Sequence, residues 1–199
     1  MPLREIDIRT DKVDKPHVVV LGAGCSRAAC PHGDANGAKL PLMDDFLDTV
    51  HPLKLLLKDA GISVDGRNFE DAYSELHQMG RTDVENEVEH VVRSYFRSLC
   101  LPSEPTLYDY LLLSLREKDV IATFNWDPFL IQAATRNSVW SDRLPKLLFL
   151  HGNLLAGSCL EHKTPIQAPI YVPCPKCESP LIESRLLYPI SEKNYESVL

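Results

Sequence analysis

Three short apolar runs, each ending abruptly in glycine or polar residues, constrain the fold of this 199-residue chain more than any other feature. They are His17 to Leu21, Val120 to Phe124 and Lys146 to Leu150. Continuous apolar runs of this length are typical of parallel strands buried on both faces, rather than of alternating antiparallel strands. We therefore expect three parallel strands in one sheet.

A mainly helical region is predicted between the first two strands. Its best-defined helix spans about Thr82 to Cys100, where apolar side chains recur at 3.6-residue spacing and Thr82 or Asp83 suits the N-cap. Strands interleaved with helices predict an α/β domain with a mostly parallel sheet. Shorter helices are expected over Leu42 to Ala60, Phe69 to Met79 and Leu107 to Glu117, and a last one starting at Asp127-Pro128.

Charge and composition limit the partners of this chain. A formal net charge of −7 opposes binding to nucleic acid or to anionic membranes. The segment from Met1 to Lys15 has no apolar signal region, and no apolar stretch reaches the roughly 20 residues that span a bilayer. We expect a cytoplasmic protein whose six cysteines are reduced thiols or metal ligands.

Distinctive polar groups follow each of the three strands. The first strand runs into Gly22-Ala23-Gly24-Cys25-Ser26-Arg27, where glycines permit close approach of a ligand and backbone N–H groups can hold phosphate. Arg27 stands where a dinucleotide fingerprint has its third glycine, so a plain tight turn is the competing interpretation.

The other two strands end in Asn125-Trp126-Asp127 and in His151-Gly152-Asn153. Separately, Asp127 is explained by helix capping, Asn125 by a turn and His151 by a structural role. Ligands of open parallel sheets bind outside the carboxyl ends of the strands, where successive loops converge. We therefore favour one shared site over three unrelated turns.

A candidate metal site follows the third strand. Cys159-Leu-Glu-His162 and Cys174-Pro-Lys-Cys177 have the spacing of a closed tetrahedral zinc site. Four ligands leave no open position, which indicates a structural role, although the place of His162 is alternatively filled by water or another side chain. The prolines and glycines of 151–181 predict a separate small module, and Cys100 is predicted to be core.

Taken together, these motifs resemble the sirtuin superfamily, and more closely its bacterial sirtuin-like branch. The likeness consists of Gly22-Ala23-Gly24-x-Ser26, Thr123 to Asp127, His151-Gly152 and the cysteine knuckle, in that order. The resemblance implies a Rossmann-like NAD-binding core over 16–150 with a helical insertion at about 42–118. A zinc-ribbon module over 151–181 and a return segment over 182–199, shorter than in the family, would follow.

The resemblance also implies roles for individual residues. Gly22, Ala23, Gly24 and Ser26 would face the pyrophosphate of NAD, and Trp126 would belong to the same cofactor-binding set. Asn125 and Asp127 would orient the nicotinamide-side ribose and the attacking water, with His151 as general base. An imidazole suits that task because its ordinary pKa is about 6.5.

Two departures from protein-deacylating sirtuins favour hydrolysis of NAD. The stretch Gly37 to Phe46 lacks their arginine, and the aromatic Trp126 resembles NAD hydrolases of antiphage defence. We expect an NAD hydrolase releasing nicotinamide and ADP-ribose. An NAD-dependent protein deacylase and a non-catalytic NAD or ADP-ribose sensor stay open as alternatives, as does action as a homo-oligomer or with a fused or associated effector domain.

Overall fold

The computed structural model describes residues 15–162 and 166–190. The expectations for Met1 to Asp14 and for the end of the return segment, 191–199, lie outside these residues. In chain order the elements are β1 (Val18–Leu21), α2 (Ala23–Ala29), the 3₁₀ turn η1 (Met43–Asp45), α3 (Phe46–Thr49), α4 (His51–Asp59), α5 (Phe69–Gln78), α6 (Thr82–Arg97), α7 (Leu107–Ser114), β2 (Val120–Thr123), α8 (Phe129–Asn137), β3 (Lys146–Phe149), β4 (Ala156–Cys159), β5 (Ile166–Pro169) and β6 (Ile182–Glu183).

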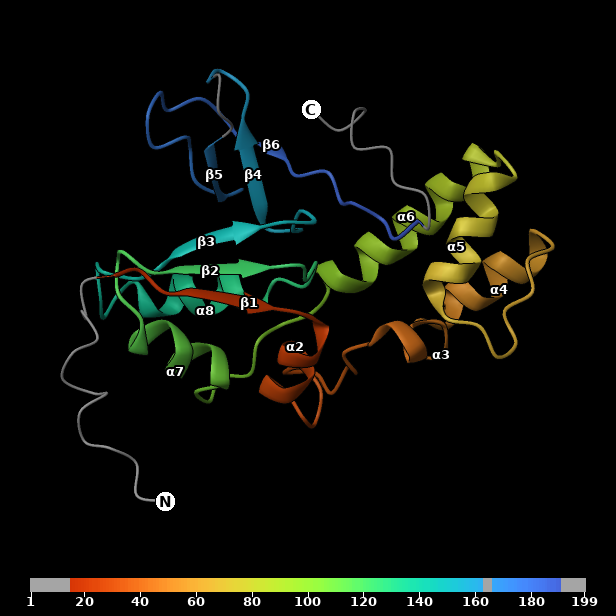
Figure 1. Ribbon diagram of the computed structural model, residues 1–199, viewed down its shortest axis with the longest axis horizontal. Coiled ribbons are helices and arrows are strands. Elements are labelled where there is room, and N and C mark those ends of the chain that lie inside the picture. The colour runs from red at the N-terminus through yellow and green to blue at the C-terminus, as the bar shows by residue number, and fades with distance from the viewer. Residues whose placement is uncertain (1–14, 163–165, 191–199) are drawn as a thin grey trace.

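The main sheet has the order β1-β2-β3, and both pairings are parallel. This confirms the mixed α/β fold and the three parallel strands predicted from the apolar runs. The three carboxyl ends point toward a lobe formed by α3 to α6, while α7 and α8 lie beside the sheet (Figure 1). Every loop that leaves a strand of this sheet therefore starts at the edge nearest the helical lobe.

In the part of the chain that the structure describes, one face of the main sheet is covered and the other is exposed on its outer strands. Ile121 is buried on that face, whereas Val18 and Val20 on the other face keep 65% and 61% of their surface exposed. Leu148, which lies two strands from Val20 in the same register, is exposed as well. The prediction of strands buried on both faces is wrong for the outer strands, whereas Ala122 of the central strand is buried on this face as well.

Several predicted helix bounds differ from the observed ones for local reasons. The expected helix from Leu42 to Ala60 is broken into η1, α3 and α4, because Pro52 has no N–H to donate across the junction at Val50. Helix α8 begins at Phe129, one residue later than expected, with Pro128 at the N-cap. Helix α2 was not predicted at all, since glycines disfavour helix interiors.

Capping residues explain where two other helices begin. Asn68 accepts a hydrogen bond from the backbone N–H of Asp71 and starts α5. Thr106 and Asp109 form a capping box at the start of α7. Neither Thr82 nor Asp83 caps α6, whose N-cap position is held by Arg81.

A second, small antiparallel sheet has the order β5-β4-β6. Its last strand, β6, leads into residues 184–190, which we call the strap and which run from the small sheet toward α6 (Figure 1). Leu186 of the strap is buried in the same core as the helical lobe. Within residues 15–162 and 166–190, no helix combines the length and apolar character required to cross a bilayer.

Candidate functional site at the carboxyl edge of the main sheet

A cavity of about 280 Å³ opens at the carboxyl edge of the β1-β2-β3 sheet. Loops after all three strands reach it, and helical-lobe residues together with the strap close its other sides. The lining residues are Ala23, Ser26, Leu40, Pro41, Leu42, Met43, Phe46, Glu70, Phe96, Phe124, Asn125, Trp126, Asp127, His151, Leu187 and Pro189. Residues predicted as one site, from segments far apart in the sequence, thus share one cavity.

The two glycines of the predicted phosphate loop lie beside this cavity and do not line it. Gly22 is the N-cap of α2 and Gly24 lies in its first turn, so the glycine run forms the start of a helix. A Cβ atom added at either position would meet no heavy atom within 4 Å. No neighbouring protein atom therefore requires glycine at these two positions.

The Asn125 side chain is held inward by its nitrogen. Nδ2 donates hydrogen bonds to the Gly22 carbonyl oxygen at 3.0 Å and to the Ser26 hydroxyl at 2.8 Å. A carbonyl oxygen can only accept, so the contact with Gly22 determines which end of the amide is the nitrogen. These bonds join the loop after β2 to the start of α2.

Asp127 lies under the cavity as a buried carboxylate. Its Oδ2 accepts a hydrogen bond from the Ser26 hydroxyl at 2.6 Å, and its Oδ1 accepts one from the backbone N–H of Phe129 at 3.2 Å. Burial raises the pKa of the Asp127 carboxyl to about 6, although the bond from Ser26 acts in the opposite direction. Asp127 therefore contacts the N-terminus of α8, and its carboxyl has a pKa of about 6.

Ser26 is the centre of this network. Its side chain is only 2% exposed, and its hydroxyl contacts Asp127, Asn125 and the Tyr108 hydroxyl, the last at 2.6 Å. Tyr108 comes from α7 and is buried. Sequence reasoning missed Tyr108, because nothing in the apolar run of α7 separates it from ordinary core residues.

His151 reaches the cavity from the loop after β3. Its ring packs edge-to-face against Phe124, with centroids 4.9 Å apart, and both residues line the cavity. The backbone oxygen of His151 accepts a hydrogen bond from the N–H of Leu187 in the strap at 3.0 Å. Gly152 has a φ of +77°, and a Cβ there would lie 2.2 Å from the Arg185 carbonyl oxygen, so the strap passes too close for any other residue.

Asn153 connects two of the site loops and was also missed as a functional residue. Its side chain is fully buried, and Nδ2 donates to the backbone oxygen of Asp127 at 2.6 Å and, more weakly, to that of Asn125 at 3.4 Å. Its Oδ1 accepts from the N–H of Leu155. Its position directly after His151-Gly152 was the available signal.

Trp126 stands in an aromatic cluster between the sheet edge and the helical lobe. The ring of Tyr188 lies 5.0 Å from the Trp126 ring, and those of Phe96 and Phe46 lie at 5.9 and 6.4 Å. Tyr188 also stacks on Tyr73 of α5, at 5.0 Å. The cluster holds the strap, the loop after β2 and the helical lobe together around one wall of the cavity.

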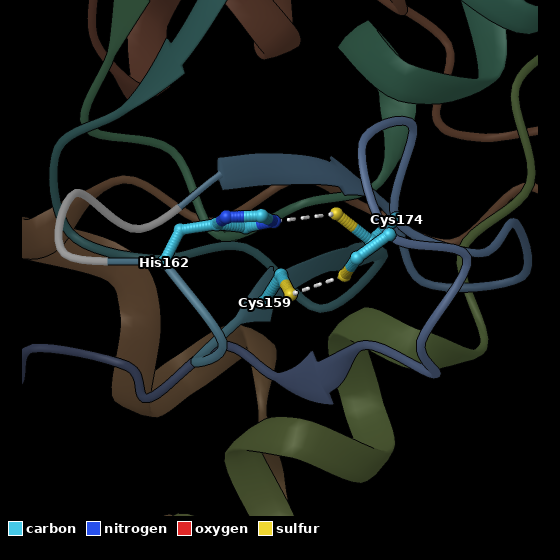
Figure 2. A group of neighbouring side chains, drawn as sticks. Cys159, His162 and Cys174 are labelled. Atoms are coloured by element: carbon cyan, nitrogen blue, oxygen red, sulfur yellow. Dashed lines mark hydrogen bonds between the residues drawn. The ribbon is translucent and has the colours of Figure 1, made fainter.

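Four side chains at one end of the small sheet are positioned to bind a metal ion. The donor atoms of Cys159, His162, Cys174 and Cys177 all lie within 4.8 Å of one another. The sulfurs of Cys159 and Cys177 are 3.5 Å apart, and Nε2 of His162 lies 3.4 Å from the sulfur of Cys174 (Figure 2). Tetrahedral zinc sites place ligand atoms roughly 3.5 to 3.8 Å apart, so the donor set and spacing are compatible with structural zinc.

The thiols of this cluster differ in their surroundings. Hydrogen bonds from Ser179 lower the pKa of the Cys177 thiol to about 6, whereas desolvation raises that of Cys159 to about 11. A thiolate, the form that binds metal, is thus favoured at Cys177 near neutral pH. Outside the cluster, Cys30 is buried and Cys100 is exposed, so the prediction of a core position for Cys100 is wrong.

No protein-family model matches this chain, and no curated protein matches it significantly.

Proposed function

We propose that the cavity binds NAD and hydrolyses its nicotinamide–ribose bond, releasing nicotinamide and ADP-ribose, as the resemblance to sirtuin-like NAD hydrolases implies. The observation that carries the proposal is the meeting of Asn125, Asp127 and His151 on one cavity at the carboxyl edge of a parallel sheet. The proposal has three further parts. The main sheet belongs to a Rossmann-like domain, and the metal of the cysteine cluster is zinc. The hydrolysis of NAD serves antiphage defence.

The size of the cavity suits part of the substrate. Small-molecule sites usually have volumes of roughly 300 to 1,000 Å³, and this cavity has about 280 Å³. It accommodates the nicotinamide-side ribose and ring, with the pyrophosphate outside at the start of α2. The open space at Gly22 and Gly24 is compatible with phosphate oxygens approaching the backbone there.

Hydrolysis of the nicotinamide–ribose bond depends more on the positioning of the ribose and the water than on a strong general acid. Nicotinamide leaves as a neutral molecule, so the transition state resembles an oxocarbenium ion. Asn125 orients the ribose without adding a charge, and Asp127 acts behind it through Ser26. His151 accepts the proton of the attacking water, whose oxygen forms the new bond to the ribose carbon.

Incubation of the purified protein with NAD, followed by chromatography of nicotinamide and ADP-ribose, tests the proposal. We expect His151→Ala and Asn125→Ala to reduce the turnover rate about 100-fold or more. His51→Ala is the matched control, because His51 is exposed in α4 and does not line the cavity. Equal background rates in wild type and Asn125→Ala would end the enzymatic proposal.

The same assay separates the alternatives. A deacylase would cleave NAD only with an acyl-lysine peptide present. A sensor would bind NAD or ADP-ribose in calorimetry without turnover, and His151→Ala would bind equally well.

A further inference from the structure

The least expected residue at the site is Tyr108, whose hydroxyl lies in the buried network although Tyr108 does not line the cavity. It comes from α7, on the covered side of the main sheet (Figure 1). Its ring is 1% exposed, and burial raises the pKa of its hydroxyl, which keeps that group protonated. It therefore offers one proton to the network at every physiological pH.

The number of hydroxyl protons on Ser26 and Tyr108 determines which residue donates in each hydrogen bond. Ser26 has one hydroxyl proton, which it donates to Oδ2 of Asp127 at 2.6 Å. The 2.6 Å contact between Ser26 and Tyr108 therefore has Tyr108 as the donor. The order of donation is Tyr108 to Ser26 to Asp127, and it ends on a carboxylate, which strengthens each bond.

Asn125 is held against this chain of hydroxyls. Nδ2 has two protons, and its partners are the Gly22 carbonyl oxygen, Ser26 Oγ at 2.8 Å and, more distantly, the Tyr108 oxygen at 3.4 Å. Because Ser26 donates its only proton to Asp127, its oxygen faces Asn125 purely as an acceptor. Without the Tyr108 proton, Ser26 loses one of its two donors and is held by its bonds with Asp127 and Asn125 alone.

We propose that Tyr108 is a positioning residue for the site: by donating to Ser26 it holds Ser26 toward Asp127 and so fixes the orientation of the Asn125 amide at the cavity wall. Ser26, on this account, organises Asn125 and is not a phosphate ligand. The effect on turnover rests on the proposed NAD hydrolysis, whereas the effect on the Asn125 amide does not.

Tyr108→Phe removes only the hydroxyl from a fully buried ring. Tyr73→Phe is the matched control, because Tyr73 is also buried and its hydroxyl donates to Glu89 at 3.2 Å, away from the cavity lining. Ser26→Ala is the positive reference, since it removes the central acceptor. Urea unfolding of all variants checks that the folded fraction at the assay temperature equals that of wild type.

The first readout is solvent exchange of the Asn125 side-chain amide protons, followed by NMR on ¹⁵N-labelled protein. We expect exchange about 10-fold faster in Tyr108→Phe than in wild type and in Tyr73→Phe, as for loss of one network hydrogen bond. The second readout is NAD turnover, with kcat reduced about 10-fold and KM nearly unchanged in Tyr108→Phe.

Outcomes for the two proposals are distinguishable. Faster exchange in Tyr108→Phe without any NAD turnover in wild type would support the positioning role and defeat the hydrolase proposal. An active wild type in which Tyr108→Phe matches Tyr73→Phe in both readouts, while Ser26→Ala does not, would overturn the positioning role and leave the hydrolase proposal standing.

Discussion

Asp127 shows how one side chain takes its properties from its neighbours. Aspartate is usually a fully ionised surface residue, but here it is buried and its ordinary pKa of 3.8 is raised to about 6. The bonds from Ser26 and from the Phe129 N–H reduce the cost of burying the charge without removing it. A raised pKa in the folded protein has a defined consequence for stability.

At the residue scale we predict that Asp127→Asn changes the pH dependence of the free energy of unfolding. A carboxyl whose folded pKa is raised stabilises the folded protein below pH 4, and that contribution is lost as pH rises through about 6. Between pH 3.5 and 7.5, wild type should therefore lose about 3 kcal/mol relative to the variant. Urea unfolding across this range measures the difference, and parallel curves for the two proteins would contradict it.

The strap, residues 184–190, connects the small sheet with the loops at the edge of the main sheet and with the helical lobe. It leaves the small sheet at β6, contacts His151 through the Leu187 N–H and packs Tyr188 between Tyr73 and Trp126. Just before it, Glu183 forms ion pairs with Arg93 and Arg97 of α6. Aromatic packing and partly exposed ion pairs thus both hold the strap in place.

At the element scale we predict that aromatic packing is the larger contribution. Tyr188→Ala removes two ring contacts and should reduce the free energy of unfolding by about 2 kcal/mol. Glu183→Gln should cost less than about 1 kcal/mol, because the side chains in these ion pairs are partly exposed and the charges are screened by solvent. Urea unfolding compares them, and a larger loss in Glu183→Gln would reverse this ranking.

On the scale of the whole molecule, the main sheet and the small sheet differ in the interactions that stabilise them. The main sheet shares a core with the helical lobe, whereas few side chains of the small sheet are buried among the described residues, chiefly Ala156 and two of the cysteines. Ala156 belongs to the main core, and the two buried cysteines lie in the candidate metal cluster. Metal binding by the cysteine cluster would add a constraint on this part of the chain.

For the whole molecule we predict about one zinc per chain in metal analysis. Cys174→Ser should lose the metal and lower the thermal midpoint, because metal binding and folding of the small sheet are coupled. Cys100→Ser is the matched control, since Cys100 is exposed and lies outside the cluster. A metal-free wild type, or a Cys174→Ser protein as stable as Cys100→Ser, would disprove the prediction.

Local patterns were sufficient for much of the fold and for the metal cluster. The apolar runs predicted all three parallel strands to within one residue, because strands of parallel sheets are typically short, continuous apolar runs bounded by glycine or polar residues. The spacing of Cys159, His162, Cys174 and Cys177 was sufficient because the ligands of a tetrahedral site come from two short knuckles. Which face of the sheet is covered was not predictable, since Val20 and Val19 are the same residue type.

What the sequence alone determined is therefore the set of strands, the order of the polar groups that follow them and the metal-ligand spacing, because each depends on neighbours in the chain. Only the tertiary structure decided that Tyr108, Ser26 and Asp127 form one network, that Asn153 links two loops and that the strap closes the cavity. These contacts join residues from 26 to more than 100 positions apart. Their geometry follows from the packing of whole elements, and no local periodicity records it.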